Sequence, residues 1–239
     1  MSGPVAGMVT ALQMSASSGE YARFVDNSAR ARLLRGVFEA YYAEVSAGRV
    51  IFDTNRSWTG RLPLLAELFP DCRVICCVRQ LGWIINSIET LLNRNALQLT
   101  RLFEVKPMLS SYSRAEYLMN PKKGLIGLAW GTLREAWFGA EAKRLIIVAY
   151  DSLVSKPLET MQKLYAELEE PYYAHDFDDV SYEESGFDTG MGLVGMHKVG
   201  GKVAAAQRTL VIPPDLFARY AEFSFWQKPE LNRGGVLVL

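Results

Sequence analysis

The chain has 239 residues, 49% of them hydrophobic, and its 26 Lys and Arg residues balance 26 Asp and Glu residues, so the formal net charge is zero. A chain of this length and apolar content can bury one substantial core, and we expect a single domain over residues 1–239. The zero net charge argues against a nucleic-acid partner, which normally meets a basic face. A local basic pocket for one small, multiply charged molecule remains compatible with it.

The cysteines and the first residues indicate the compartment. Cys72, Cys76 and Cys77 lie in or beside one apolar stretch, and neighbouring strand residues point to opposite faces, so Cys76 and Cys77 are not expected to pair. No metal-ligand spacing surrounds them. No apolar run approaches the roughly 20 residues that span a bilayer, and residues 1–13 lack the features of a secretory signal. We therefore expect a cytoplasmic protein with no metal and no membrane partner, whereas the oligomeric state cannot be read.

The first third of the chain predicts a loop and one long helix. Residues 17–26 are polar. Asn27 or Ser28 can cap a helix that runs to residue 47, and Gly48 suits its end. The buried stripe of this helix follows a spacing of three and four. It comprises Leu33, Leu34, Val37, Phe38, Tyr41, Tyr42 and Val45.

Residues 48–89 predict strand, short helix, strand and helix. Residues 50–52 form a brief apolar run, Pro63 suits the first turn of a helix over residues 62–69, and residues 73–79 (RVICCVR) are apolar throughout, as in a strand covered on both faces. Asp53 and Arg79 then follow the carboxyl ends of two strands, where open α/β sheets bind ligands. Ser87 lies eight residues beyond Arg79, in the first turns of the next helix. An arginine fork followed by a helical hydroxyl is a suitable clamp for an anion.

The later chain continues the alternation. Residues 124–140 have helical spacing, residues 144–150 (RLIIVAY) predict a strand, Ser155 predicts the cap of a helix with Pro157 in its first turn, and residues 213–226 predict a last helix. Alternating strands and helices indicate an α/β fold with a parallel sheet flanked by helices.

Two segments carry a family resemblance. LFPDCRVICCVRQLGWIINS, which contains Arg79 and Ser87, resembles the segment with which cytosolic-type and Golgi-type sulfotransferases hold the 3'-phosphate of PAPS (3'-phosphoadenosine-5'-phosphosulfate). VAYDSLVSKPLETMQKLYAEL, at residues 148–168, resembles the run whose tyrosine contacts the adenine, here Tyr150. The resemblance implies a divergent, bacterial sulfotransferase with a P-loop-NTPase-like fold. Residues 198–202 resemble more weakly the family's loop over the 3'-phosphate, with Lys202 its cation.

The beginning of the chain departs from the family pattern. The family opens with a strand, a loop of the kind PRSGTT and a helix, because backbone N–H groups and a cation must cradle the 5'-phosphosulfate. Residues 1–6 (MSGPVA) carry no such loop, and residues 5–14 resemble the region that follows the family's first helix. The sequence therefore predicts an N-terminally incomplete sulfotransferase fold, in which the edge of the strand over residues 50–52 or 73–79 stays unpaired.

The resemblance implies transfer of a sulfuryl group from PAPS, without metal, to a hydroxyl or amine of a small-molecule or carbohydrate acceptor. A base stands near the position of Asp53 in the family, which makes Asp53 the catalytic candidate, although the lysine that follows in the family is Thr54 here. Two alternatives stay open. One is a nucleotide-binding relative with impaired catalysis, and the other, ranked lower because no G-x-x-x-x-G-K-[ST] is present, is a P-loop-type kinase relative.

Overall fold

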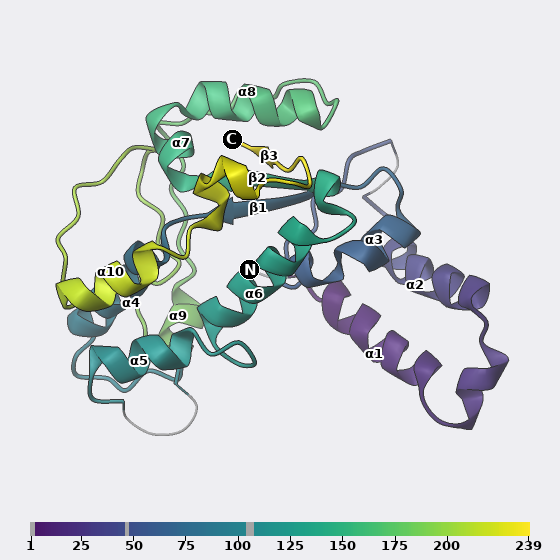
Figure 1. Ribbon diagram of the computed structural model, residues 1–239, viewed down its shortest axis with the longest axis horizontal. Helices are drawn as coiled ribbons and strands as arrows, with labels where there is room; N and C mark the ends of the chain where they lie inside the picture. The colour runs from purple at the N-terminus through teal and green to yellow at the C-terminus, as the bar shows by residue number, and fades with distance from the viewer. Residues whose placement is uncertain (1–2, 46–47, 104–107) are drawn as a thin grey trace.

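The computed structural model describes residues 3–45, 48–103 and 108–239. Its sheet has three parallel strands in the order β1 (Val74–Val78), β2 (Leu145–Ala149) and β3 (Leu237–Val238). The first two lie within the predicted ranges 73–79 and 144–150, which confirms both predictions. With helices packed around a parallel sheet, the fold is of the mixed α/β class (Figure 1).

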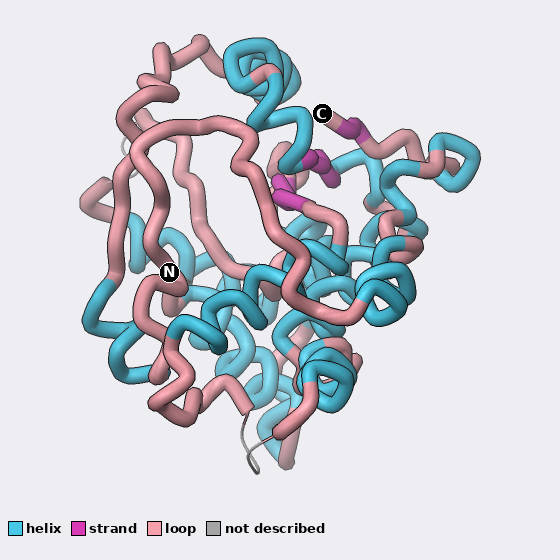
Figure 2. The backbone as a smooth tube through the Cα atoms, turned by 90° about the vertical axis from the view of Figure 1, so that its left-hand side faces the viewer, coloured by secondary structure: helices cyan, strands magenta, loops and turns pink. Residues whose placement is uncertain are grey.

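Helices make up most of the rest. The α-helices are α1 (Val5–Ser17), α2 (Asn27–Tyr42), α3 (Leu62–Leu68), α4 (Leu81–Arg94), α5 (Ser111–Leu118), α6 (Leu125–Phe138), α7 (Tyr150–Ser155), α8 (Pro157–Glu167), α9 (Ser185–Met191) and α10 (Pro214–Ala221). Short 3-10 helices are η1 (Glu20–Phe24), η2 (Thr59–Arg61), η3 (Ala142–Arg144), η4 (Phe225–Gln227) and η5 (Pro229–Leu231). Long loops before and after α9 run along one side of the molecule and lead to α10 (Figure 2).

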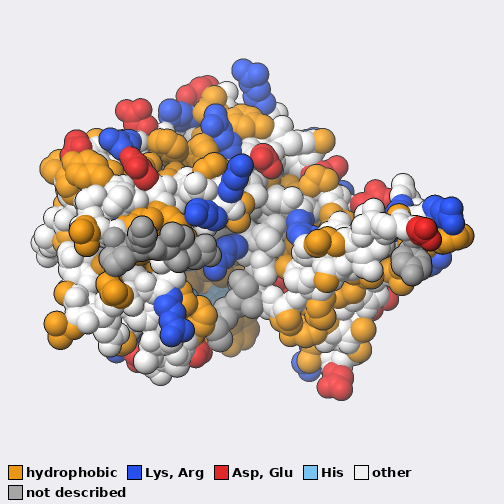
Figure 3. All heavy atoms as spheres, turned by 90° about the horizontal axis from the view of Figure 1, so that it is seen from below, with side chains coloured by type: hydrophobic (Ala, Val, Ile, Leu, Met, Phe, Trp, Pro, Cys, Tyr) orange, Lys and Arg blue, Asp and Glu red, His pale blue; other side chains and the backbone are white. Residues whose placement is uncertain are grey.

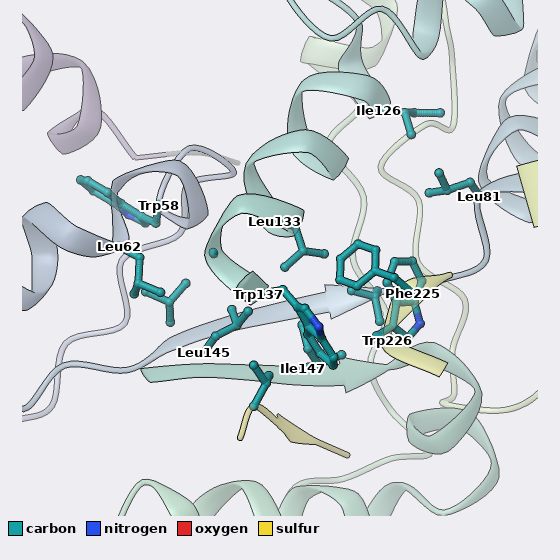
Figure 4. Close-up of a cluster of buried hydrophobic side chains, with 14 of the residues drawn as sticks. Trp58, Leu62, Leu81, Ile126, Leu133, Trp137, Leu145, Ile147, Phe225 and Trp226 are labelled. Atoms are coloured by element: carbon teal, nitrogen blue, oxygen red, sulfur yellow. The ribbon is translucent and has the colours of Figure 1, made fainter. Parts of the chain in front are cut away.

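The sheet separates two apolar layers. Because side chains alternate along a strand, Leu145 and Ile147 of β2 belong to the larger core, whereas Ile146 and Val148 pack in a smaller cluster with Leu164 of α8. Figure 1 shows α6 and α8 on opposite sides of the sheet. In the larger core, aromatic side chains from α6 and η4 fill the space above β2 (Figure 4). Burial on both faces explains why β2 reads as a continuous apolar run, whereas β1 is covered less completely.

Three local predictions are wrong. Residues 49–55 form no strand: Val50 and Phe52 are 52% and 61% exposed and pair with no neighbour, because a three-residue apolar run cannot hold a place in a sheet without a partner. Ser155 ends α7 instead of capping α8, which begins after Lys156. Tyr150 is the first residue of α7 and not the last of a strand.

The structure also bears on three further expectations, which concern the end of α2, the cysteines and the edge of the sheet. Helix α2 ends at Tyr42, and residue 47, the predicted end, lies outside the described residues. All three cysteines are free of disulfides. Cys77 is exposed, so the expectation that the strand over residues 73–79 is covered on both faces is wrong at this position. Among the described residues, β1 pairs only with β2, so its other edge carries no strand.

Candidate functional site

The carboxyl ends of β1 and β2 bring two of the predicted residues together. Arg79 follows β1 directly and Tyr150 follows β2, and the register pairs Val78 with Ala149 immediately before them. The guanidinium carbon of Arg79 lies 4.7 Å from the centroid of the Tyr150 ring. This is a cation–π contact, and it fixes the direction of the arginine at the edge of the sheet.

A second arginine, which the sequence did not reveal, lies against the same tyrosine. The guanidinium carbon of Arg208 is 4.6 Å from the Tyr150 ring centroid and 5.5 Å from that of Trp83, in the first turn of α4. Two cations and two aromatic rings therefore gather where β1 and β2 end. Nothing in the sequence near Arg208 marks it, because its partners lie far away in the chain.

Asn86 on α4 explains how Arg208 reaches this place. Its buried side chain donates from Nδ2 to the carbonyl oxygen of Thr209 at 3.0 Å, and its Oδ1 accepts from the N–H of Val211 at 2.8 Å. These bonds tie the extended segment after Arg208 to the helix. One buried amide thus positions a cation from a distant part of the chain.

The electrostatics of the arginine pair favour an anion. Burial lowers the pKa of Arg79 and the charge of Arg208 lowers it further, with Tyr150 and Asp151 opposing in part. Arg79 Nε is buried and has no hydrogen-bond partner among the described residues. A buried donor on a cation without a carboxylate partner is costly, and a bound oxyanion would satisfy it.

Asp53 lies in a separate, well-bonded arrangement. Its carboxylate accepts from the hydroxyl of Tyr42 at 2.5 Å and from Nε1 of Trp58 at 2.6 Å. Burial raises the pKa of Tyr42, and the hydrogen bond to Asp53 raises it further. Figure 4 shows Trp58 beside Leu62 on the side of the sheet where β1 and β2 begin, whereas Arg79 follows the other end of β1.

Comparison with known families assigns the chain. A family model described as the sulfotransferase family matches residues 8–174, more than half of the chain. The chain belongs to the sulfotransferase family. The match includes four of the predicted site residues, Asp53, Arg79, Ser87 and Tyr150, and ends before Lys202 and Arg208. A search of curated proteins found no match.

In this sulfotransferase the predicted residue Ser87 lies on α4, and no described contact joins it to the arginine pair. It is exposed, one turn after Trp83 on the same side of α4 and next in sequence to Asn86. Lys202 is exposed on a connection held by hydrogen bonds of its neighbours Gly201 and Val203, and the described contacts do not join it to the arginine pair.

His197 of the sulfotransferase is held by a buried carboxylate, that of Asp188. His197 donates its backbone N–H to Asp188 at 2.8 Å, and its Nδ1 lies 2.5 Å from the other carboxylate oxygen. Burial alone would raise the pKa of Asp188, but these hydrogen bonds hold it below its usual value. The pair closes the loop after α9, where the N–H of Leu193 also donates to the Asp188 carbonyl oxygen and the His197 ring packs against Phe187.

Within residues 3–45, 48–103 and 108–239, no helix is long and apolar enough to cross a membrane. The same residues contain no group of three or more His, Cys, Asp or Glu side chains that could hold a metal ion.

Proposed function

We propose that this sulfotransferase moves a sulfuryl group from PAPS to a hydroxyl or amine of a small-molecule or carbohydrate acceptor, leaving 3'-phosphoadenosine-5'-phosphate (PAP). The arrangement of Arg79 and Arg208 against Tyr150 carries the proposal, because it offers two guanidiniums, one with an unsatisfied buried Nε, at the ends of two parallel strands. A phosphate monoester has the charge and the several oxygens that such a pair binds well. A cytoplasmic protein with a single sulfotransferase domain over residues 1–239 is part of the same proposal.

The nucleotide end is assigned to five residues. Arg79 and Arg208 bind the 3'-phosphate, and the Ser87 hydroxyl donates to it from α4. Tyr150 contacts both guanidiniums, and we expect the adenine beside it. Lys202 lies six residues before Arg208 on the same exposed connection and supplies a further cation when the nucleotide is bound. These roles need no metal, since the charges that face the nucleotide are all side-chain cations.

The acceptor end is assigned to Asp53 on the family resemblance, and since Asp53 lies on the side of the sheet where β1 and β2 begin, the donor must reach from the arginine pair across the sheet to it. Hydrogen bonds from Tyr42 and Trp58 hold its carboxylate in one orientation, as a general base requires. PAPS supplies an activated sulfuryl group when bound. Asp53 takes the proton of the acceptor hydroxyl or amine, and the positioned cations stabilise negative charge on the nucleotide phosphates.

A transfer assay tests this function. The chain is incubated with sulfur-labelled PAPS and a panel of phenols, alcohols, sugars and amines, and we expect a labelled product together with PAP. Asp53→Asn should lower turnover while PAP binding stays unchanged, and Glu67→Gln, an exposed carboxylate change on α3, serves as the control.

The assay also separates the alternatives. Tight PAP binding without transfer to any acceptor would indicate a nucleotide-binding protein and overturn the enzymatic assignment. Transfer of the γ-phosphate of ATP to the same acceptors, with no preference for a 3'-phosphorylated nucleotide, would indicate the kinase instead.

A further inference from the structure

Helix α2 presents an apolar face that no other part of the described chain covers. Five residues along it are spaced alternately by four and three, as in the seam of a coiled coil. They are Ala29, Leu33, Gly36, Ala40 and Ala43. The Leu33 side chain is 48% exposed, and Ala40 and Ala43 are exposed as well.

The opposite face of α2 already makes the contacts that hold it in the fold. Leu34 is buried, and Phe38 and Tyr42 pack against the core. Helices α1 and α2 form a hairpin that stands out from the rest of the molecule (Figure 1), and Figure 3 shows hydrophobic side chains exposed on this lobe. The apolar face that contains Leu33 and Gly36 is therefore not needed for packing within one chain.

Gly36 lies at the middle of this face. Glycine in a helix interior is disfavoured relative to alanine, yet a Cβ added to Gly36 would meet no atom within 4 Å. The chain itself thus gives no steric reason for the missing side chain. Glycine and alanine do allow the backbone of another helix to approach closely.

The charges beside the seam decide what kind of partner fits. Arg32 and Glu39 lie seven residues apart on the same flank, and both are exposed. Arg32 donates to the hydroxyl of Ser28 at 2.9 Å, and neither it nor Glu39 takes part in a salt bridge within the described chain. In an antiparallel helix pair, equivalent flanks face each other, so this flank is complementary to itself.

We propose that α2 binds α2 of a second copy of this chain in an antiparallel, two-fold symmetric pair. Leu33 fills the space above Gly36 of the partner subunit, and Ala29 packs on Ala40 of the partner subunit. In this register Arg32 meets Glu39 of the partner subunit, and the two-fold axis repeats the ion pair. The interface is isologous, as in most homodimers, and is independent of the proposed reaction.

Sedimentation velocity of the 239-residue chain tests the proposal. From about 1 to 100 µM we expect a concentration-dependent dimer. Gly36→Glu, which places a charge in the seam, should abolish it. Gly131→Glu is the matched control, because Gly131 is also helical and a Cβ there also meets no atom within 4 Å. A monomer at every concentration, or a dimer unaffected by Gly36→Glu, would overturn the proposal.

A charge exchange tests the register. Arg32→Glu or Glu39→Arg alone puts like charges together twice and should weaken the dimer roughly tenfold or more. The double exchange R32E/E39R should restore the original affinity, since the two charges then meet in the reverse order. Failure of the double exchange to recover any affinity would rule out the antiparallel register, whereas a change in helix stability alone predicts no rescue.

Discussion

A partly buried arginine lies near each end of helix α4. One of the two is paired with a carboxylate, and the other is not. Near its carboxyl end, Arg114 of α5 forms two parallel hydrogen bonds with Glu89, from Nε to Oε1 at 2.8 Å and from Nη2 to Oε2 at 2.6 Å. Just before its amino end, Arg79 has a buried Nε without a partner and a second cation, Arg208, nearby.

The two pKa shifts express the same difference. The hydrogen bond to Glu89 raises the pKa of Arg114, whereas burial and the charge of Arg208 lower the pKa of Arg79. An arginine that already has its carboxylate fixes two helices to each other. An arginine with a buried and unpaired donor has its binding capacity free for an anion from outside the chain.

The largest expected effect on stability comes from removing the carboxylate that pairs with Arg114. Glu89→Ala leaves the charge of Arg114 without its partner in a largely buried place, so we expect a loss of about 3–5 kcal/mol in the free energy of unfolding. Urea denaturation followed by circular dichroism measures it. Glu141→Ala removes the carboxylate of a more exposed pair with Arg144 and should cost at most about 1 kcal/mol. Equal losses would mean that Glu89 is not a structural partner.

Removing the unpaired arginine should affect binding instead of stability. Arg79→Ala is expected to weaken PAP by about 1.5–3 kcal/mol, or roughly 10- to 100-fold, and to change AMP affinity much less. The unfolding midpoint should not fall, because a buried donor without a partner disappears. Calorimetric titration of both nucleotides measures the effect, with exposed Arg94 on α4, changed to alanine, as control. Equal weakening of PAP and AMP would make Arg79 structural.

A smaller effect is expected where α4 holds the second cation. Asn86→Ala removes the hydrogen bonds to Thr209 and Val211, so the segment that carries Arg208 should lose its fixed position. We expect PAP affinity to fall by about 1 kcal/mol, roughly fivefold. Asn93→Ala, an exposed change on the same helix, should leave it unchanged. If Asn86→Ala binds PAP as tightly as the parent, Arg208 does not depend on this clamp.

The smallest effect should come from the hydroxyl on α4. Ser87→Ala removes a single neutral donor, so the loss of PAP affinity should be about 0.5–1.5 kcal/mol, with AMP unchanged. Ser87→Thr keeps the hydroxyl and should retain most of the binding. Identical PAP affinities for all three proteins would remove Ser87 from the site.

The sequence predicts local elements well where local chemistry decides them. The apolar runs that became β1 and β2, the periodic helix α4 after Arg79 and the proline-marked starts of α3 and α8 were all visible. Arg79 and Tyr150 were also found, because each stands at the end of such a run and within a family motif. Their contact follows from the parallel register.

What the sequence did not show depends on partners far away in the chain. Arg208 joins Tyr150 only because Asn86 binds the backbone beside it, across more than 100 residues. Strand β3 is two residues long and exists through pairing with Ile146 and Ile147. The short run at residues 50–52 failed as a strand for the converse reason, since it found no neighbour. The stabilisation that a strand gains from pairing with a distant strand leaves no pattern in its own short sequence.

If the arginine pair of this sulfotransferase recognises a 3'-phosphate, titration of the unmodified chain with PAP, AMP and ADP under one salt condition should reveal it. PAP and AMP differ only in the 3'-phosphate, so their affinity ratio isolates that group. We expect PAP to bind roughly tenfold more tightly than AMP and ADP, or tighter still. Equal affinities for the three nucleotides would contradict it.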